Sequence, residues 1–196
     1  MSGTPEIETE RLILRRFTLA DAEAFFRLMS DEKVNTFLPL FSLKSIREAE
    51  EFLQENYFKS YEGPTGFRYA VCLKSDNIPI GYVSVNDDDN RDLAYGLRPD
   101  HWRRGIATEA CGALIGRLRE TDIPYITATH DVNNPGSGGV MKKIGMTYRY
   151  SYRELWQPKD IWVTFRMYQL NFDGRDDRVY RGYWDRYPVH FVEENV

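Results

Sequence analysis

The sequence predicts a mixed α+β fold, and the spacing of its apolar residues is the basis of this prediction. Seven segments show the alternation or β-rich composition of strands, and four segments carry apolar residues at helical spacing. Their order along the chain is βααβββαβαββ. We therefore expect a central, mostly antiparallel mixed sheet of about seven strands, flanked by about four helices.

Capping signals mark the helices of the first half. Thr18 precedes Asp21, and Ser45 precedes Glu48, at the three-residue spacing of a capping box. The second helix is expected to bury one face, made of Ile46, Ala49, Phe52, Leu53 and Tyr57. The strands of this half are predicted at residues 11–17, 67–73, 78–86 and 92–97.

The second half alternates strands and helices before it ends in two aromatic-rich strands. A helix is predicted at 105–119, and a second one has Asn134 as its cap, Pro135 in its first turn and Gly145 as its stop. Strands are predicted at residues 124–131, 146–155 and 161–170. We therefore expect one domain at 1–171, followed by a charged, tyrosine-rich C-terminal extension at 172–196.

Composition excludes several classes of protein. The chain has 196 residues, of which 42% are apolar and 29% charged, with a net charge of -4. Its apolar runs are too short to cross a bilayer, and no signal segment opens it. Two separated cysteines and three scattered histidines suggest no disulfide framework or metal site. We expect a cytoplasmic protein that binds neither membranes nor nucleic acid.

The stretch HWRRGIATEA, at residues 101–110, is the first candidate binding site. It lies between a predicted strand and a predicted helix, where backbone N–H groups lack partners and the helix dipole is positive. Arg103 and Arg104 add charge, Gly105 and Ala107 are small, and Thr108 offers a hydroxyl. The stretch therefore suits a phosphate or pyrophosphate, although a solvated basic turn would have the same local features.

Two motifs together resemble the GCN5-related N-acetyltransferases (GNAT). The first, WRRGIA at 102–107, is similar to the (Q/R)-x-x-G-x-(G/A) signature, and N-x-x-S-x-x-V-M-x-K-x-G-M begins at Asn134. Trp102, the ATEA that ends the stretch, and ETERLILR at 8–15 resemble the branch of ribosomal-protein alanine and serine N-acetyltransferases. The resemblance implies a sheet splayed on either side of the cofactor-loop helix and acetyl-coenzyme A as cosubstrate. The cofactor contacts that it implies are Leu97, Trp102, Arg103, Arg104, Gly105, Ile106, Ala107, Thr108, Asn134 and Ser137.

The same resemblance implies catalytic roles for two residues. Asp92 begins DLAY, where the related branch has an acidic residue, and is our candidate base, with a solvated strand-end carboxylate as the alternative. Ser137 is the candidate donor to the leaving thiolate, because Met141 stands where many members have a tyrosine. Its alternative role is that of an ordinary first-turn residue. The backbone of Leu97 is expected to polarise the thioester carbonyl.

These inferences favour an N-acetyltransferase that acts on a protein N-terminus or a small primary amine, as a monomer or homodimer. Two other functions stay open: a catalytically silent acyl-coenzyme A-binding module, and a nucleic-acid binder, which the acidic charge disfavours. Candidates for the acceptor cleft are Phe37, Leu38, Phe41, Tyr82, Trp156 and Trp162. The extension, with Tyr180, Tyr183, Trp184 and Tyr187, is expected to pack on the surface, to cover the acceptor site or to form a dimer contact.

Overall fold

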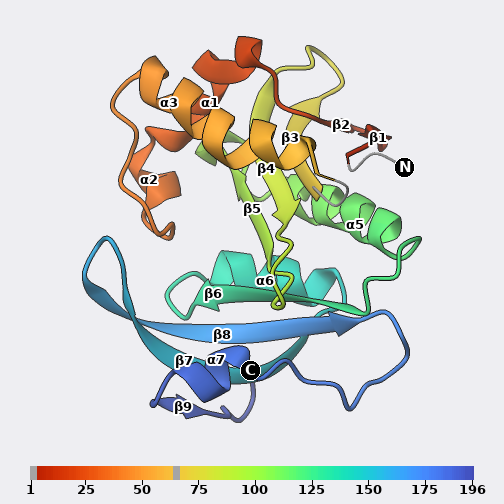
Figure 1. Ribbon diagram of the computed structural model, residues 1–196, viewed down its shortest axis with the longest axis vertical. Coiled ribbons are helices and arrows are strands. Elements are labelled where there is room, and N and C mark those ends of the chain that lie inside the picture. Colours follow the sequence, from red (N-terminus) through yellow and green to blue (C-terminus); the bar gives the residue numbers. More distant parts are fainter. Residues whose placement is uncertain (1–3, 64–66) are drawn as a thin grey trace.

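The computed structural model describes residues 4–63 and 67–196 and contains two antiparallel sheets (Figure 1). The first sheet has the order β1-β2-β3-β4-β5, and the second has the order β6-β8-β7-β9. The strands of the first sheet are β1 (Ile7–Glu8), β2 (Leu12–Arg15), β3 (Phe67–Leu73), β4 (Pro79–Val85) and β5 (Leu93–Leu97). Those of the second are β6 (Tyr125–Asp131), β7 (Thr147–Trp156), β8 (Ile161–Asn171) and β9 (His190–Phe191).

The two sheets meet at one point and then diverge, which confirms the predicted splay. Asp92 forms a parallel bridge with Thr127, and the Thr127 N–H donates to the Arg91 carbonyl at 3.3 Å. Beyond this bridge β5 and β6 belong to different sheets, and the helix at Ile106–Leu118 connects them along the chain. All seven predicted strands are present, and the short strands β1 and β9 are additional.

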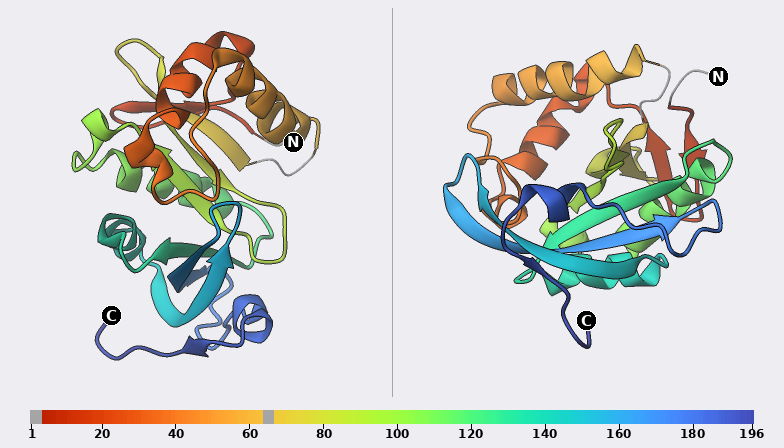
Figure 2. Two further views of the ribbon diagram at one scale, coloured as in Figure 1. Left: turned by 90° about the vertical axis from the view of Figure 1, so that its left-hand side faces the viewer. Right: turned by 60° about the horizontal axis from the view of Figure 1, so that its bottom comes forward.

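Helices cover both faces of the first sheet (Figures 1 and 2). Strand alternation directs Leu12, Tyr69 and Val71 to the face that α5 covers, and Ala70 and Cys72 to the face that the N-terminal helices cover. The N-terminal helices are α1 (Ala22–Met29), α2 (Glu32–Asn35), α3 (Ile46–Leu53) and α4 (Lys59–Tyr61), with a π-helical turn at Gln54–Phe58. The later helices are α5 (Ile106–Leu118), α6 (Pro135–Lys143) and α7 (Gly182–Arg186).

The C-terminal extension packs on the second sheet through a separate aromatic cluster. Tyr152 on β7 lies between Tyr183 and Tyr187, with ring centroids 4.9 Å from each and nearly parallel planes. Glu193 forms an ion pair with Arg166 on β8. The extension is therefore a built part of the molecule that adds the edge strand β9 to the sheet.

Local details differ from the sequence expectations at the helix ends. The capping box of Thr18 and Asp21 is present, but it caps the start of a 3₁₀ turn at Leu19–Asp21, which precedes α1. Ser45 accepts from the Glu48 N–H as predicted, whereas the Glu48 carboxylate accepts from Lys44. Ile46 is 44% exposed and does not join the buried face of α3, because it is the first residue of that helix. No helix within the described residues is long and apolar enough to span a membrane.

Candidate active site

A cavity of about 1170 Å³ occupies the opening between the two sheets. Both predicted catalytic residues line it, together with all but one of the predicted cofactor contacts. The predicted residues in its wall are Asp92, Leu97, Trp102, Arg103, Gly105, Ile106, Ala107, Thr108, Asn134 and Ser137. Arg104 does not line the cavity. Its carbonyl instead accepts from Arg11 Nη1 at 2.9 Å.

The loop before α5 depends on a backbone conformation that favours glycine. Gly105 is the N-cap of α5 and has φ +75°, and Arg103 has φ +60°. Only an Arg11 side-chain atom would meet a Cβ at Gly105, at 3.5 Å, so the conformation and not the space explains the glycine. The loop thus turns sharply enough for the free N–H groups of the first turn of α5 to end at the cavity.

Glu109 holds this loop to the beginning of the chain. Its carboxylate accepts from Thr9 Oγ1 at 2.6 Å, from the Arg11 N–H at 3.1 Å and from Arg11 Nε at 2.7 Å. Burial alone would raise the pKa of Glu109, but these hydrogen bonds outweigh it and lower that pKa. In the sequence, ETER at 8–11 and ATEA at 107–110 are separate signatures. In the structure, Thr9 and Arg11 of the first donate hydrogen bonds to Glu109 of the second. Thr9, Arg11 and Glu109 are therefore site-supporting residues that the sequence interpretation missed.

Trp102 contributes a hydrogen bond as well as a ring. Its indole Nε1–H donates to the Leu97 carbonyl at 2.7 Å. Because the Arg98 N–H bonds to Ile80 on β4, ladder alternation turns the N–H and carbonyl of Leu97 away from β4, toward the opening. The predicted Leu97 N–H thus faces the cavity, while Trp102 satisfies the carbonyl of the same residue.

Helix α6 enters the opening from the side of β6. Asn134 caps it by accepting from the Ser137 N–H at 3.3 Å, as predicted. A Cβ at Gly138 would lie 2.6 Å from His130 Nε2 on β6, so this glycine allows the helix to approach the strand. Tyr95 on β5 spans the opening, with its hydroxyl 2.8 Å from both the carbonyl and Oγ of Ser137. Sequence reasoning did not assign Tyr95 this contact with Ser137.

Asp92 lies at the apex of the opening, where the two sheets meet. Its Oδ1 is buried without a hydrogen-bond partner among the described residues. Burial raises the pKa of Asp92 to about 7, and a contact with Thr127 acts in the opposite direction. Its negative charge in turn contributes to the raised pKa of Tyr82 and of Tyr183, both of which are raised mainly by burial. This carboxyl is therefore desolvated and titrates near neutral pH, unlike an ordinary strand-end aspartate.

The far end of the cavity carries four of the six predicted acceptor residues. Phe37, Leu38, Tyr82 and Trp156 line it. Phe41 and Trp162 do not, and this part of the prediction is wrong: their side chains are 62% and 64% exposed. The ring of Trp162 packs instead under the Arg153 guanidinium.

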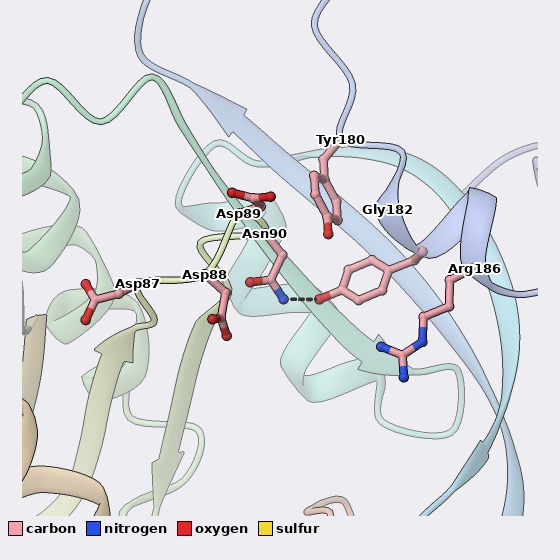
Figure 3. Close-up of a pocket in the computed structure, with 8 residues that line it drawn as sticks. Asp87, Asp88, Asp89, Asn90, Tyr180, Gly182 and Arg186 are labelled. Carbon is pink, nitrogen blue, oxygen red and sulfur yellow. Dashed lines mark hydrogen bonds between the residues drawn. The ribbon is translucent and has the colours of Figure 1, made fainter.

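Part of the C-terminal extension reaches the same cavity. Tyr183, Arg186 and Tyr187 are among its lining residues, whereas Tyr180 and Trp184 pack against the second sheet. The Asn90 amide donates to the Tyr183 hydroxyl at 2.6 Å, the bond drawn in Figure 3. A second pocket of about 560 Å³ lies between residues 87–90 and α7. Figure 3 shows the residues that line it. The extension thus closes one side of the opening.

The comparisons with known proteins agree with this geometry. The model of the acetyltransferase (GNAT) domain family matches residues 11–147. The chain therefore belongs to the GNAT family of acetyltransferases, which confirms the resemblance read from its two motifs and the prediction of an acetyltransferase enzyme. The matched residues include the loop before α5, Asp92 and α6, and exclude the extension.

Several individual proteins are similar to the chain. An uncharacterized N-acetyltransferase, YoaA of Bacillus subtilis, is 27% identical over 72% of the chain and 82% of its own length. A GNAT-family acetyltransferase from Bacillus anthracis shares the fold with TM-score 0.75 and 23% identity, over 86% of this chain and 99% of that one. RimL, a ribosomal L7/L12 α-N-protein acetyltransferase solved with coenzyme A, gives TM-score 0.74 and 19% identity over the same shares.

Proposed function

We propose that the protein transfers the acetyl group of acetyl-coenzyme A to a primary amine by direct attack of the amine. One observation carries the proposal: a single cavity contains both an anion-binding helix start and a desolvated carboxyl with a pKa of about 7. Asp92 precedes β5 and the loop before α5 follows it, so the two reach the cavity from opposite ends of this strand. The cavity can therefore hold a phosphate-bearing cosubstrate and deprotonate an amine.

The residues of the loop fit the diphosphate of coenzyme A. Arg103, Thr108 and the first residues of α5 line the cavity, so a guanidinium, a hydroxyl and free helix N–H groups are available to bind an anion there. The wall leaves open space at Gly139 on α6, because no atom lies within 4 Å of a Cβ built there. When bound, acetyl-coenzyme A supplies a thioester, whose carbonyl carbon accepts the amine and whose sulfur leaves.

Asp92 acts as the general base in this proposal. A primary amine is mostly protonated at neutral pH, because lysine and α-amines titrate at about 10.4 and about 8. A carboxylate with a pKa near 7 accepts a proton more readily than an ordinary aspartate does. Asp92 faces the cavity directly, with an Oδ1 that bonds to no described residue, so that it can take the proton itself or through one water.

Two groups on opposite walls serve the reacting carbonyl and the leaving sulfur. The Leu97 N–H faces the opening and is placed to stabilise the developing oxyanion. Ser137 is placed to donate to the thiolate, because the Tyr95 hydroxyl can donate its single proton to Ser137 Oγ, 2.8 Å away. The serine hydroxyl proton is then free for the sulfur, and Tyr95 acts as a positioning residue for Ser137.

The acceptor enters at the end of the cavity that carries Phe37, Trp156 and the tail residues Tyr183 and Tyr187. We propose that residues 1–171 form the catalytic domain and that residues 172–196 complete its acceptor wall. The stacked contacts of Tyr152 support this role, because they fix the tail tyrosines to β7.

Isothermal titration with acetyl-coenzyme A and then with coenzyme A tests the cofactor half of the proposal. Arg103 and Arg104 provide a matched pair, since only Arg103 lines the cavity. We expect micromolar binding that Arg103→Glu weakens at least tenfold and that Arg104→Glu weakens less. Equal losses would contradict the assigned loop geometry, and no binding by the wild-type protein would reject the cosubstrate.

Thiol release during incubation with a panel of amines tests the catalytic half. The proposal expects release that depends on both the amine and acetyl-coenzyme A. Tight cosubstrate binding with no release on any amine would instead favour the catalytically silent binding module. Asp92→Asn in the same assay shows whether any release passes through the proposed base.

A further inference from the structure

We propose that Arg68 forms an anion-binding subsite in the acceptor end of the cavity, so that the substrate is an amine that also carries a carboxylate or a phosphate. The inference rests on the proposed acetyl transfer and narrows its substrate class. It comes from the place of one arginine on the sheet and from what surrounds it.

Arg68 is a cavity-lining cation without a carboxylate partner among the described residues. Its Nε is buried and makes no hydrogen bond there. Arg15 on the adjacent strand provides the contrast, because its guanidinium binds Asp21 through Nη1 at 2.8 Å and Nη2 at 2.9 Å. A partly buried guanidinium whose charge is not compensated by the protein is costly, and an anionic ligand would compensate it.

The backbone of Arg68 is held by hydrogen bonds, so its side chain starts from a defined place beside the cavity. Arg68 pairs with Ser84 on β4, and the Tyr61 hydroxyl donates to the Arg68 carbonyl at 3.0 Å. Phe67 and Tyr69 belong to the core on the α5 side. Strand alternation therefore places Arg68 on the opposite face, which the N-terminal helices cover and the cavity enters.

Arg68 and Asp92 lie on the same face of the sheet. The cross-strand row runs from Arg68 to Ser84 and on to Ala94, which is two residues from Asp92. Two strand spacings and two residues along a strand separate their Cα atoms by roughly 12 Å. A small molecule can thus place its amine at Asp92 and an anionic group at Arg68.

Two buried tyrosines add polar groups to the wall of the cavity. Tyr57 and Tyr82 are 5% and 8% exposed and line the cavity. Burial raises the pKa of Tyr57; the Tyr82 hydroxyl raises it further, and the Arg68 guanidinium acts in the opposite direction. The Asp92 charge acts on Tyr82 in turn. In the cross-strand register Ser84 is the residue between Arg68 and Asp92, and the cavity wall is positive at Arg68 and negative at Asp92.

The pair of Arg68 and Asp92 is complementary to an amine with an anion at its other end. An ammonium approaches Asp92, and a carboxylate or phosphate oxygen finds the guanidinium, which binds both groups through paired N–H donors. An amine with a second cation in place of the anion would meet Arg68 with like charge. Simple polyamines are thus the class that this surface disfavours.

Paired substrates test the subsite. One pair is phenylalanine and phenylalaninamide, and the other is phosphoethanolamine and ethanolamine. The kcat/KM for thiol release is measured for each member with the wild-type protein, Arg68→Gln, Arg68→Lys and the exposed control Arg47→Gln on α3. Dividing the wild-type preference by that of a variant removes the effect of different amine pKa values.

We expect the wild-type protein and Arg47→Gln to prefer the anionic member of at least one pair. Arg68→Gln should reduce that preference tenfold or more, and Arg68→Lys should keep part of it. Loss in the first pair alone identifies a carboxylate, and loss in the second alone identifies a phosphate. A preference that Arg68→Gln leaves unchanged, or a wild-type protein without preference in either pair, overturns the inference.

A binding measurement separates this inference from the proposed reaction. N-acetylphenylalanine and its amide carry no reactive amine, and their affinity is measured in the presence of free coenzyme A. Tighter binding of the carboxylate to the wild-type protein, lost in Arg68→Gln, supports the subsite even where no amine releases thiol. Equal affinities in both proteins, together with no effect of Arg68 on any substrate pair, reject it.

Discussion

The two ends of the cavity are built in different ways. The proposed cofactor end comes mainly from two short stretches, at 102–109 and 134–138, whose turn and cap contacts are mostly local, and Thr9 and Arg11 clamp the first of them from a distant part of the chain. The acceptor end comes from many distant segments, among them Phe37, Arg68, Asp92, Trp156 and Tyr183. One end is therefore a local motif, and the other is a product of strand register and tail packing.

The difference predicts different responses to mutation. At the cofactor end the backbone itself is the binding group, so changes that loosen its supports should reduce stability and cosubstrate affinity together. At the acceptor end, side chains that project from the sheet contact the amine. Changes there should therefore alter turnover or amine affinity and leave cosubstrate binding intact.

The largest effect is expected at the point where the two ends meet. Asp92→Asn keeps the shape of the side chain but removes the proton acceptor, so we expect kcat to fall by about 10²- to 10⁴-fold. The wild-type rate should rise with pH through about 7, as the carboxyl loses its proton, and this step should vanish in the variant. Initial rates between pH 5.5 and 9 measure both.

The control for this change is Asp88→Asn, in the exposed loop before Asp92. It should keep both the rate and the pH step. An unchanged pH profile in Asp92→Asn would remove Asp92 from the mechanism. The affinity of this variant for acetyl-coenzyme A must equal that of the wild type, so that its fall in kcat can be assigned to catalysis.

The second effect concerns the clamp that supports the cofactor loop. Glu109→Ala removes the acceptor of three hydrogen bonds from Thr9 and Arg11, and we expect the free energy of unfolding to fall by about 2–3 kcal/mol. Affinity for acetyl-coenzyme A should weaken as well, because Arg11 also binds the Arg104 carbonyl. Urea unfolding and titration calorimetry measure the two losses.

The sign of the pH dependence checks this interpretation. The pKa of Glu109 is lower in the folded protein, so its contribution is present above the unfolded value of about 4.3 and is lost as the pH falls through the folded value. Wild type and Glu109→Ala should therefore differ most near neutral pH and converge in acid. A difference that persists at the lowest pH would point to packing instead of charge.

At the proposed cofactor end, local physics predicted the turn and the caps, whereas the assignment to coenzyme A came from the family resemblance. A left-handed glycine at the N-cap of α5, a side-chain cap at Asn134 and basic residues beside a helix start each restrict the residue types allowed at fixed spacing. What the sequence did not show was contact between distant stretches. The bonds from Thr9 and Arg11 to Glu109, and the outward turn of Arg104, depend on how β1 and β2 lie beside α5.

The third effect is smaller and isolates one hydrogen bond. Trp102→Phe keeps a ring in the loop but leaves the Leu97 carbonyl without its indole donor, at a cost of about 1–3 kcal/mol. Because the Leu97 N–H is the proposed oxyanion donor, we expect kcat to fall more than the affinity for coenzyme A. A matching loss in both quantities would show that Trp102 only shapes the binding loop.

The acceptor end was harder to predict, because it depends on alternation and register across strands. Asp92 was assigned through the family resemblance at DLAY, but its bridge to Thr127 and the burial that raises its pKa are not revealed by sequence spacing. Phe41 and Trp162 are of residue types that are common in pockets, yet they are exposed. Arg68 is of a type that is common on surfaces, yet it lines the cavity. Hydrophobicity alone does not separate these cases.

The smallest expected effect tests whether the tail belongs to the acceptor end. Tyr183→Phe keeps the stacked ring beside Tyr152 but removes the hydroxyl that accepts from Asn90, near Asp92. We expect KM for the amine to change by about 2- to 10-fold, corresponding to one hydrogen bond, with the affinity for acetyl-coenzyme A unchanged. Tyr180→Phe, whose ring lies outside the cavity wall, is the control and should leave KM unaltered. A shift in cosubstrate affinity without a shift in KM would place the tail at the wrong end, because a residue that meets only the acceptor wall can act on the amine alone.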